Sequence, residues 1–514
     1  MILGETDDTD RPSRGPSLTL DDIFRTHAQR RADAPALIDP LNRASFTGGG
    51  PLRLSYAQAD RIVGAIAARL RGMGLPAGTI VGIHLPNTVE NFLAMLGVFR
   101  AGMAVAALPL LFRRSELAAA LTRIGAKVII SCDRVGSLAQ AECALNVAAD
   151  VFSIRYVCGF GENPPDGVVS FSDLMTAEIP DFAPAEPIAK RTNAAAHVAV
   201  ITFELGEGGI VPVARSHAEL MAGGLAVLLE SGIGPHAVIQ STLAPSSFAG
   251  ICLSLVPWLL CGGTLVLHHP FDAATLVRQI HDERCTALVL PDAVAFRLAA
   301  TGLLAETRLT SIIAAWRAPE RLATSPLWHV AAMALVDVAL FGEAALVPAR
   351  RGAQGAPRPI PLGPPVAPRD AADGVAVADL SRTESGTVAV RGPMVPRHAL
   401  PPGIETSGLP HFKIGARGLV DTAYACRFDA DTKALIVTGP PTGTVRVGGY
   451  RFVLQDIRAS VSGIDAGAKI GALSDAVVGQ RLFGTAADRH AAQAALRAAG
   501  LNPLIVAAFD SQAT

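Results

Sequence analysis

The sequence predicts an α/β protein with two layered α/β subdomains, and two observations carry this prediction. Apolar segments rich in β-branched residues alternate with amphipathic helical segments, which is the pattern of parallel strands joined by crossover helices. The chain has 514 residues, of which 50% are hydrophobic, so it can bury a large core and form more than one domain. We therefore expect a large globular protein.

The first subdomain is predicted from residues 79–132. Strands are expected at "TIVGIHLP", "MAVAALPL" and "AKVIISC", and helices at "NTVENFLAMLGVFRAG" and "RSELAAALTRIG". The second subdomain is predicted from "GTLVLHHPFDAATLVRQIHDERCTALVLP". There a strand, a helix and a second strand follow one another over about thirty residues, the length of one βαβ unit. The same pattern therefore occurs in two separate parts of the chain.

From Arg351 onward, Pro, Gly and short strands such as "GTVAVRGPM" predict a small β-rich subdomain. It ends near "VTGPPTGT", which divides a domain of residues 17–438 from a small α+β domain of residues 439–514. Residues 1–16 are polar and acidic, and we expect them to form a disordered tail. They do not look like a secretory signal, so a cytoplasmic location is expected.

The composition argues against several kinds of partner. The 44 basic and 45 acidic residues give a net charge of −1, which provides no long-range field for nucleic acid or an anionic membrane. The 7 cysteines form no CxxC pair, so neither a zinc site nor a disulfide framework is predicted. Two long apolar stretches are interrupted by Pro257, Gly262 and Asp337, so they suit buried layers better than membrane spans.

Several phrases of sequence stand in a characteristic order. They are "LSYAQADRIVGAIAARL" near the N-terminus, "ESGTVAVRGPMV" in the β-rich part, and "TVRVGGYRFVLQDIR" with "IGALSDAVVGQRL" after the boundary. In this order they resemble the adenylate-forming (AMP-binding) superfamily, in particular acyl-CoA synthetases and fatty-acid–CoA ligases. The resemblance implies a large N-terminal domain of two α/β subdomains and a β-barrel-like subdomain, followed by a mobile C-terminal lid, here shortened. It also implies chemistry at the domain junction, where a carboxylate and ATP give acyl-AMP before transfer to coenzyme A or a carrier.

The family's phosphate-binding loop corresponds to "ITFELGEGGIVPVARSHAEL", residues 201–220. Four positions keep the frame of the motif: Gly206, Gly209, Ser216 and His217. Glu204 and Glu207 stand in the region of the hydroxyl-bearing residues, and the lysine is missing. A carboxylate about 4 Å from a phosphate costs about 1 to 4 kcal/mol in repulsion, so we expect no triphosphate here. The alternative is a glycine-rich strand-to-helix turn with both glutamates solvated, and His217 then caps a helix or satisfies a backbone group.

The family's metal-binding turn corresponds to "LFGEAAL". Phe341 and Gly342 are in register, but Ala344 and Ala345 replace the threonine and glutamate. Glu343 lies two positions early and is the one weak candidate for a catalytic residue. We therefore expect no metal site and no bound cofactor.

The residues that bind ribose and adenine, form the hinge and supply the catalytic lysine in the family are also missing here. Ile414 and Ala416 stand at the polar positions of the ribose motif, and Pro440 replaces the hinge arginine. Trp316 stands where a small residue would admit adenine; it either fills or caps the purine site or is an ordinary core or surface aromatic. The lysines are Lys127, Lys190, Lys413, Lys433 and Lys469, and none matches the family's catalytic lysine.

The residues together favour a pseudoenzyme or repurposed acyl-binding member of the family that has lost ATP-dependent activation. If an acyl pocket survives, Phe248 and Gly250 are expected to line it with Phe341 and Gly342, unless all four are plain core. One alternative is an atypical acid–thiol ligase that uses ATP, Mg²⁺ and coenzyme A, with Glu343 as metal ligand and arginines replacing lysines. Another is a scaffold or regulatory partner of a true synthetase or acyl carrier. A third, an enzyme acting on a pre-activated thioester, has no residue signature.

Overall fold

The computed structural model describes residues 18–510 apart from residues 177–192, 207, 331, 370, 372–373 and 476–477. The tail predicted for residues 1–16 and the side chain of Glu207 lie outside the described residues. In the part of the chain that is described, no helix is both long and apolar enough to cross a membrane.

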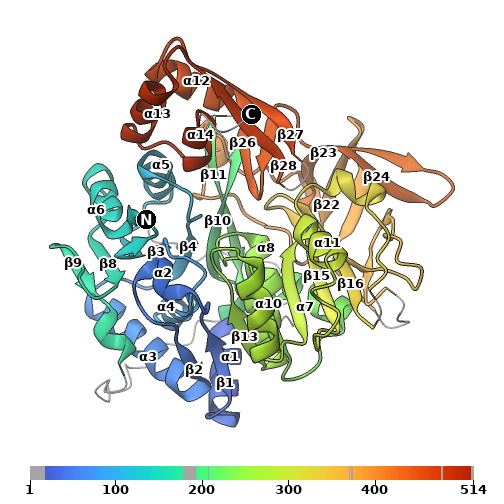
Figure 1. Cartoon of the computed structure of the whole chain (residues 1–514), viewed down its shortest axis with the longest axis horizontal. Coiled ribbons are helices and arrows are strands. Elements are labelled where there is room, and N and C mark those ends of the chain that lie inside the picture. The colour runs from blue at the N-terminus through green and yellow to red at the C-terminus, as the bar shows by residue number, and fades with distance from the viewer. Residues whose placement is uncertain are drawn as a thin grey trace.

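A mainly parallel seven-stranded sheet forms the first α/β subdomain (Figure 1). Its strand order is β11-β10-β4-β3-β5-β8-β9, and only β10 and β11 run antiparallel to each other. The strands are β3 (Ile80–Ile83), β4 (Ala104–Ala107), β5 (Val128–Cys132), β8 (Tyr156–Phe160), β9 (Val168–Ser170), β10 (Val198–Gly206) and β11 (Gly209–Ser216). The helices are α3 (Tyr56–Gly72), α4 (Val89–Arg100), α5 (Arg114–Ile124) and α6 (Gln140–Asp150). The elements predicted within residues 79–132 are confirmed.

A second sheet of eight strands forms the other α/β subdomain. Its order is β17-β16-β15-β14-β12-β13-β1-β2, parallel except at the two outer strands β17 and β2. The strands are β1 (Pro35–Ile38), β2 (Arg53–Ser55), β12 (Val238–Ser241), β13 (Thr264–Leu267), β14 (Ala287–Pro291), β15 (Ser311–Trp316), β16 (Ala334–Phe341) and β17 (Ala345–Arg350). The helices are α1 (Leu20–Arg30), α2 (Arg43–Thr47), α7 (His217–Ser231), α8 (Phe248–Gly250), α9 (Val256–Cys261), α10 (Ala273–Asp282) and α11 (Asp292–Ala300). The predicted βαβ unit is β13–α10–β14, but β12 lies between its two strands.

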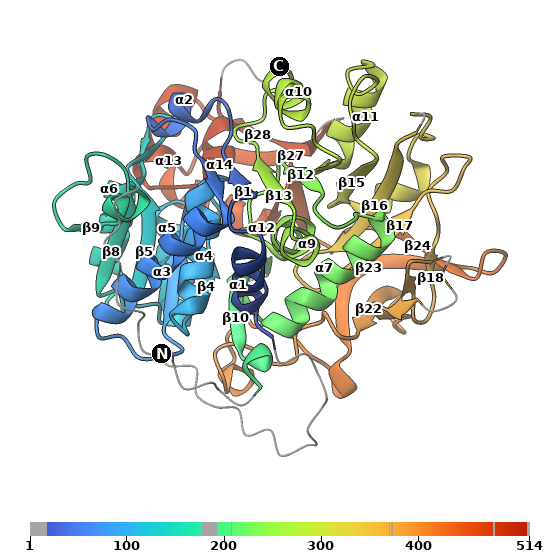
Figure 2. The same ribbon diagram turned by 90° about the horizontal axis from the view of Figure 1, so that it is seen from below.

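One hydrophobic core joins the two sheets. Val105 of β4 and Leu265 of β13 belong to the same cluster of buried side chains. Phe92 of α4 and Trp258 of α9 meet edge to face, with ring centroids 6.5 Å apart. Figure 2 shows α1 and α9 between the strands of the two sheets. The two α/β layers therefore form one body.

A five-stranded antiparallel sheet forms the predicted β-rich subdomain. Its strands in spatial order are β18 (Ile360–Pro361), β24 (Ala434–Gly439), β23 (Val420–Asp429), β22 (Thr387–Arg391) and β21 (Asp379–Arg382). Two short ribbons elsewhere are β6 (Arg134–Val135) with β7 (Leu138–Ala139) and β19 (Val366–Ala367) with β20 (Val375–Ala376).

The C-terminal domain follows β24 and has an antiparallel sheet of its own, in the order β26-β25-β28-β27. Its elements are β25 (Thr444–Val447), β26 (Tyr450–Val453), α12 (Leu454–Ile464), β27 (Lys469–Asp475), β28 (Gly479–Thr485), α13 (Arg489–Ala498) and α14 (Pro503–Ala507). A separate buried cluster that includes Val461 and Leu496 forms its core. In Figure 1 this domain lies across the end of the hairpin formed by β10 and β11. The predicted fold class is confirmed.

Candidate site at the domain junction

The glycine-rich segment forms a β-hairpin. Gly206 of β10 and Gly209 of β11 are directly paired, which leaves only residues 207 and 208 for the connection. Gly208 and Gly209 have positive φ angles of 81° and 117°, which favour glycine in such a turn. The predicted strand-to-helix turn is therefore wrong: a whole strand, β11, separates the glycines from α7. The β-branched, apolar residues of β11 continue the antiparallel pairing with β10.

Glu204 joins this hairpin to the C-terminal domain. Its Oε1 accepts a hydrogen bond from Arg451 Nη2 on β26, and the same nitrogen donates to the carbonyl oxygen of Leu205 over 3.0 Å. The side chains of Glu204 and Arg451 are 18% and 17% exposed. The expectation of a solvated Glu204 is therefore wrong, because a cation of the other domain covers this carboxylate.

The Glu204–Arg451 pair lies directly over Gly342, in the turn between β16 and β17. A Cβ atom at Gly342 would lie 2.4 Å from Glu204 Oε1 and 3.6 Å from Arg451 Nη1. Gly342 also has a φ of 58°. The preceding Phe341 is buried and packs edge to face on Tyr424 with centroids 5.4 Å apart. The structure thus brings the hairpin and the β16–β17 turn together.

Glu343 is buried next to this turn. Its Oε2 accepts a hydrogen bond from the backbone N–H of Phe248 over 2.9 Å. Burial raises the pKa of Glu343, and the nearby Arg215 opposes that rise. Among the residues that the structure describes, no group of three or more His, Cys, Asp or Glu side chains could hold a metal ion. In this arrangement, Glu343 links two segments of the core.

Arg215 on β11 is a junction residue that the sequence analysis missed. It is only 1% exposed, and its guanidinium carbon lies 3.8 Å from the centroid of the Phe248 ring. Its Nη2 donates to the carbonyl oxygens of Glu343 and Ala344, and its Nε donates to that of Met394. Its Nη1 is buried without a hydrogen-bond partner. The sequence did contain a signal for this residue: an arginine within the apolar run "IVPVARS", where a charged side chain is unusual.

Ser216 and His217 have structural roles at the start of α7. Ser216 Oγ accepts a hydrogen bond from the Glu219 N–H, and Glu219 Oε2 accepts one from the Ser216 N–H, which together form a capping box. His217 Nδ1 accepts a hydrogen bond from the Leu20 N–H over 3.4 Å, and burial lowers the pKa of His217 to about 4. These hydrogen bonds are with residues of α1 and α7 and not with the residues of the domain junction.

Phe248 and Gly250, the predicted pocket residues, are packed into the core. Phe248 is fully buried beneath Arg215. A Cβ atom at Gly250 would lie 1.9 Å from the carbonyl oxygen of Ala244, so no larger residue fits without a shift of the backbone.

Three comparisons place this architecture among known proteins. The model of a family described as "AMP-binding enzyme" matches residues 24–350. The chain belongs to the AMP-binding enzyme family. This confirms the superfamily resemblance, and the order of the two α/β sheets and the C-terminal domain agrees with it.

Curated relatives of this AMP-binding family member match over parts of their length. The long-chain fatty acid transport protein 1 of Bos taurus is 28% identical over 34% of this chain and 24% of its own length. The salicyl-AMP ligase / salicyl-S-ArCP synthetase of Mycobacterium tuberculosis is 30% identical over 33% of this chain and 28% of its own length. The matched stretches therefore span less than a third of either relative.

Solved structures share the whole fold. The amide bond synthetase McbA from Marinactinospora thermotolerans superimposes with a TM-score of 0.70 at 19% identity, covering 95% of this chain and 94% of that chain. The apo structure of MbtA from Mycobacterium smegmatis gives 0.65 at 17% identity, covering 96% and 90%. At these identities the likeness concerns the fold alone.

Trp316 is a core residue in this AMP-binding family member. It is 3% exposed, and its indole N–H donates to Asp337 Oδ1 over 2.7 Å. Asp337 in turn pairs with Arg351 over 2.7 Å, and both are buried. Of the two interpretations of Trp316, the structure therefore favours the core aromatic.

Further arginines reach the junction from both domains. Arg317 Nη1 donates to the carbonyl oxygen of Gly449 over 2.7 Å, and Arg446 donates to the carbonyl oxygen of Arg317. The Arg446 guanidinium lies 4.7 Å from the centroid of the Tyr424 ring. Burial, with Arg451 and Arg317 nearby, lowers the pKa of Arg446 to about 10. We call Arg215, Arg317, Arg446 and Arg451 the junction arginines.

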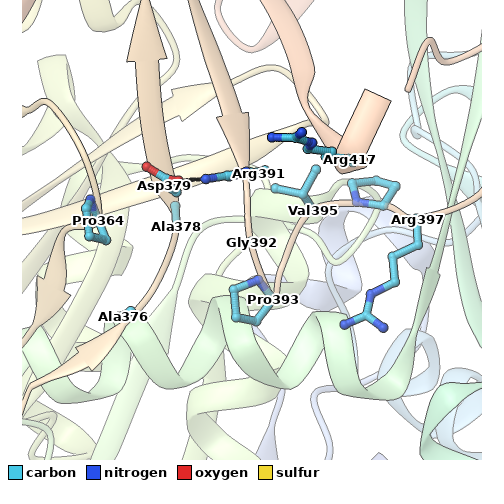
Figure 3. A pocket seen from close by; sticks show the side chains of 12 residues that line it. Pro364, Ala376, Ala378, Asp379, Arg391, Gly392, Pro393, Val395, Arg397 and Arg417 are labelled. Atoms are coloured by element: carbon cyan, nitrogen blue, oxygen red, sulfur yellow. Dashed lines mark hydrogen bonds and ion pairs between the residues drawn. The ribbon is translucent and has the colours of Figure 1, made fainter. Parts of the chain in front are cut away.

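Two cavities lie away from the junction. One of about 490 Å³ lies in the β-rich subdomain, where Asp379 and Arg391 form an ion pair along its wall (Figure 3). In that view Arg397 extends away from this pair. The other, of about 320 Å³, lies between helices of the two domains. The junction arginines line neither cavity.

Proposed function

We propose that this AMP-binding family member does not activate carboxylates with ATP, and that it has been repurposed to bind a carboxylate ligand or a protein partner. The Glu204–Arg451 pair over Gly342 carries the proposal. A carboxylate and its own counter-ion lie at the contact between the hairpin and the β16–β17 turn, the two segments that correspond to the family's phosphate-binding loop and metal-binding turn.

The hairpin offers poor chemistry for a triphosphate. Gly206 and Gly209 are paired in the strand ladder, so they do not belong to an open loop of the kind that wraps around a phosphate chain. Arg123 donates to the hairpin at the carbonyl oxygen of Ile210 over 2.7 Å. Arg451 also contacts the hairpin, at Glu204 and Leu205, and Glu204 already neutralises this arginine. Entry of a triphosphate would break this pair and leave Glu204 beside like charge.

The chain also offers poor ligands for Mg²⁺. Mg²⁺ in phosphoryl and adenylyl transfer is bound through carboxylates together with substrate phosphates. Glu343 is the candidate, but its Oε2 already accepts a hydrogen bond from the Phe248 N–H. Burial also raises the pKa of Glu343, so its ionised form, the one that binds metal, is less favoured than that of an exposed glutamate.

A carboxylate ligand is supported by the unsatisfied cation beneath the junction. Arg215 is buried, forms no ion pair with any described residue, and leaves Nη1 without a partner, although Glu343 lies near enough to attract it. A buried charge that is only partly compensated is costly unless an anion meets it. The names of these two relatives also refer to carboxylic acids, "fatty acid" in the transport protein and "salicyl" in the ligase.

Calorimetric titration of the purified protein with ATP and Mg²⁺, with and without octanoate, tests the loss of ATP use. We expect no ATP binding and no ATP–pyrophosphate exchange above the blank. Micromolar ATP binding or acid-dependent exchange would overturn the proposal. For the ligand, Arg215→Met is expected to weaken octanoate binding at least about tenfold, and an unchanged affinity would remove Arg215 from the argument.

The junction arginines favour one alternative, an atypical ATP-dependent acid–thiol ligase. Arg317, Arg446 and Arg451 converge on the junction and could supply the positive charge that the missing lysines provide elsewhere in the family. Glu343 would then have to turn toward a metal. On this alternative, Glu343→Gln abolishes acyl-CoA formation; turnover that survives the substitution argues against it.

A further inference from the structure

The cavity between the two domains has a mixed lining. Its volume is about 320 Å³, within the range of small-molecule sites. One wall comes from α5, α6 and the ribbon before α6, and the other comes from α13, α14 and their connection. Leu138, Leu501, Pro503 and Val506 give it apolar surface. A ligand here would touch both domains at once.

The polar part of the lining is mainly cationic. It includes Arg113, Arg114 and Arg497, with Asp510 as the only acidic residue. Arg114 is neutralised by Asp150 through two hydrogen bonds of 2.6 and 2.8 Å. In the described part of the chain the Arg113 side chain donates to the carbonyl oxygens of Leu110 and Phe112. Glu116 attracts its charge from one turn along α5 but forms no ion pair with its guanidinium.

Arg497 is an exposed cation on the opposite wall. In the described part of the chain, no hydrogen bond or ion pair reaches its guanidinium, and the neighbouring Gln493 side chain has no partner either. Both lie on α13 and face the start of α5, whose N-terminus adds positive potential. Two cations from opposite domains therefore share one partly enclosed space.

We propose that this cavity binds an amphiphilic anion, a short aliphatic chain with a carboxylate head, which bridges Arg113 and Arg497 and holds the C-terminal domain against α5. The head would accept hydrogen bonds from both guanidinium groups, which form no ion pair among the described residues, and the chain would lie on the apolar wall. The site is distinct from the junction, so it does not depend on the proposed loss of ATP use.

Direct contacts beside the cavity show that the two domains already meet there. Asn502 Nδ2 donates to the carbonyl oxygen of Leu111 and to Glu116 Oε1, both over 3.2 Å. Ser115 Oγ donates to the carbonyl oxygen of Gly500 over 3.4 Å. A bridging ligand would strengthen this docked arrangement because it binds only when both walls are in place.

The cavity contains its own chemical reporter. Cys143 lines it and is half-buried, whereas the other cysteines are buried. A thiol-alkylating reagent should therefore modify Cys143 first in the native protein. A ligand in the cavity should cover this thiol.

Hexanoate is the probe, and neutral hexan-1-ol is its control. We expect hexanoate to slow alkylation of Cys143, followed by peptide mass spectrometry, about fivefold or more at saturation, and hexan-1-ol to protect far less. Arg497→Gln should weaken hexanoate binding at least about fivefold. Arg489→Gln is the matched control, because Arg489 lies on the same helix over the Phe483 ring and outside the cavity.

Gln493→Glu provides a second variant, since it adds a negative charge to the cavity wall without removing an arginine. It should also weaken hexanoate binding. If hexanoate binds without protecting Cys143, it occupies another site and the proposal is overturned. The same holds if it binds Arg497→Gln as tightly as the control Arg489→Gln. Absence of any protection up to the solubility limit also overturns it. Arg215→Met should leave this protection unchanged, which separates the result from a carboxylate bound at the junction.

Discussion

The Glu204 carboxylate and the Arg451 guanidinium join the hairpin of the large domain to the first hairpin of the C-terminal domain. Both side chains are mostly shielded from water, so their attraction is screened less than that of a surface pair. Removal of one partner leaves the other buried and unpaired.

We predict that Arg451→Met lowers the free energy of unfolding by about 1–3 kcal/mol. The double variant Glu204→Gln/Arg451→Met should recover part of this loss, because no uncompensated charge remains. Urea denaturation of the wild type, both single variants and the double variant gives the coupling energy. Strictly additive losses would show that the pair contributes no coupling.

Gly342→Ala should destabilise the protein by about 1–3 kcal/mol. The new methyl group meets Glu204 Oε1 in addition to the strain of a positive φ. Gly443→Ala is the matched control, since its φ of 74° is similar but nothing lies within 4 Å of the added Cβ. Equal effects at both positions would mean that Glu204 moves aside freely. Thermal unfolding measures the difference.

Arg215→Met should be neutral or stabilising by about 1–2 kcal/mol in the ligand-free protein, because an apolar stem replaces a buried charge that lacks an ion pair. Arg215→Ala should instead cost about 2–4 kcal/mol, since it leaves a cavity beside Phe248. Chemical denaturation of both variants separates charge from packing. A large loss in Arg215→Met would show that the hydrogen bonds to the β16–β17 turn dominate.

Glu116 should make stability depend on pH. Burial raises the pKa of Glu116 from 4.5 to about 7, so the folded state binds its proton more tightly than the unfolded state. The resulting stabilisation is complete below pH 4.5 and is lost as pH rises through about 7. Glu116→Gln keeps an acceptor for Asn502 and carries no charge.

We therefore expect the stability of the wild type relative to Glu116→Gln to fall by on the order of 2 kcal/mol across this window. Urea denaturation at pH values on both sides of the window measures it. A difference that stays constant with pH would show that Glu116 ionises normally in the folded protein.

Much of the fold could be predicted because the alternation of apolar strands and amphipathic helices is local information. The hairpin at Gly206 was not predicted, because the resemblance to a phosphate-binding motif suggested an open loop. In the structure, the β-branched residues after Gly209 form a strand instead. The burial of Glu204 depends on Arg451, far away in the sequence, and periodicity carries no signal for such a pair. Arg215 was visible as a charge in an apolar run, but its stacking on Phe248 needed coordinates.

The second sheet mixes early and late parts of the chain. β1 pairs with β13, and β2 closes that edge, although all the strands between β2 and β12 belong elsewhere. During synthesis, β1 and β2 must therefore wait until β13 leaves the ribosome before their edge is covered. A fragment that begins at residue 193 would lack both strands and expose β13 as a bare edge. The two α/β layers cannot be separated by a single cut, so we expect them to fold as one unit.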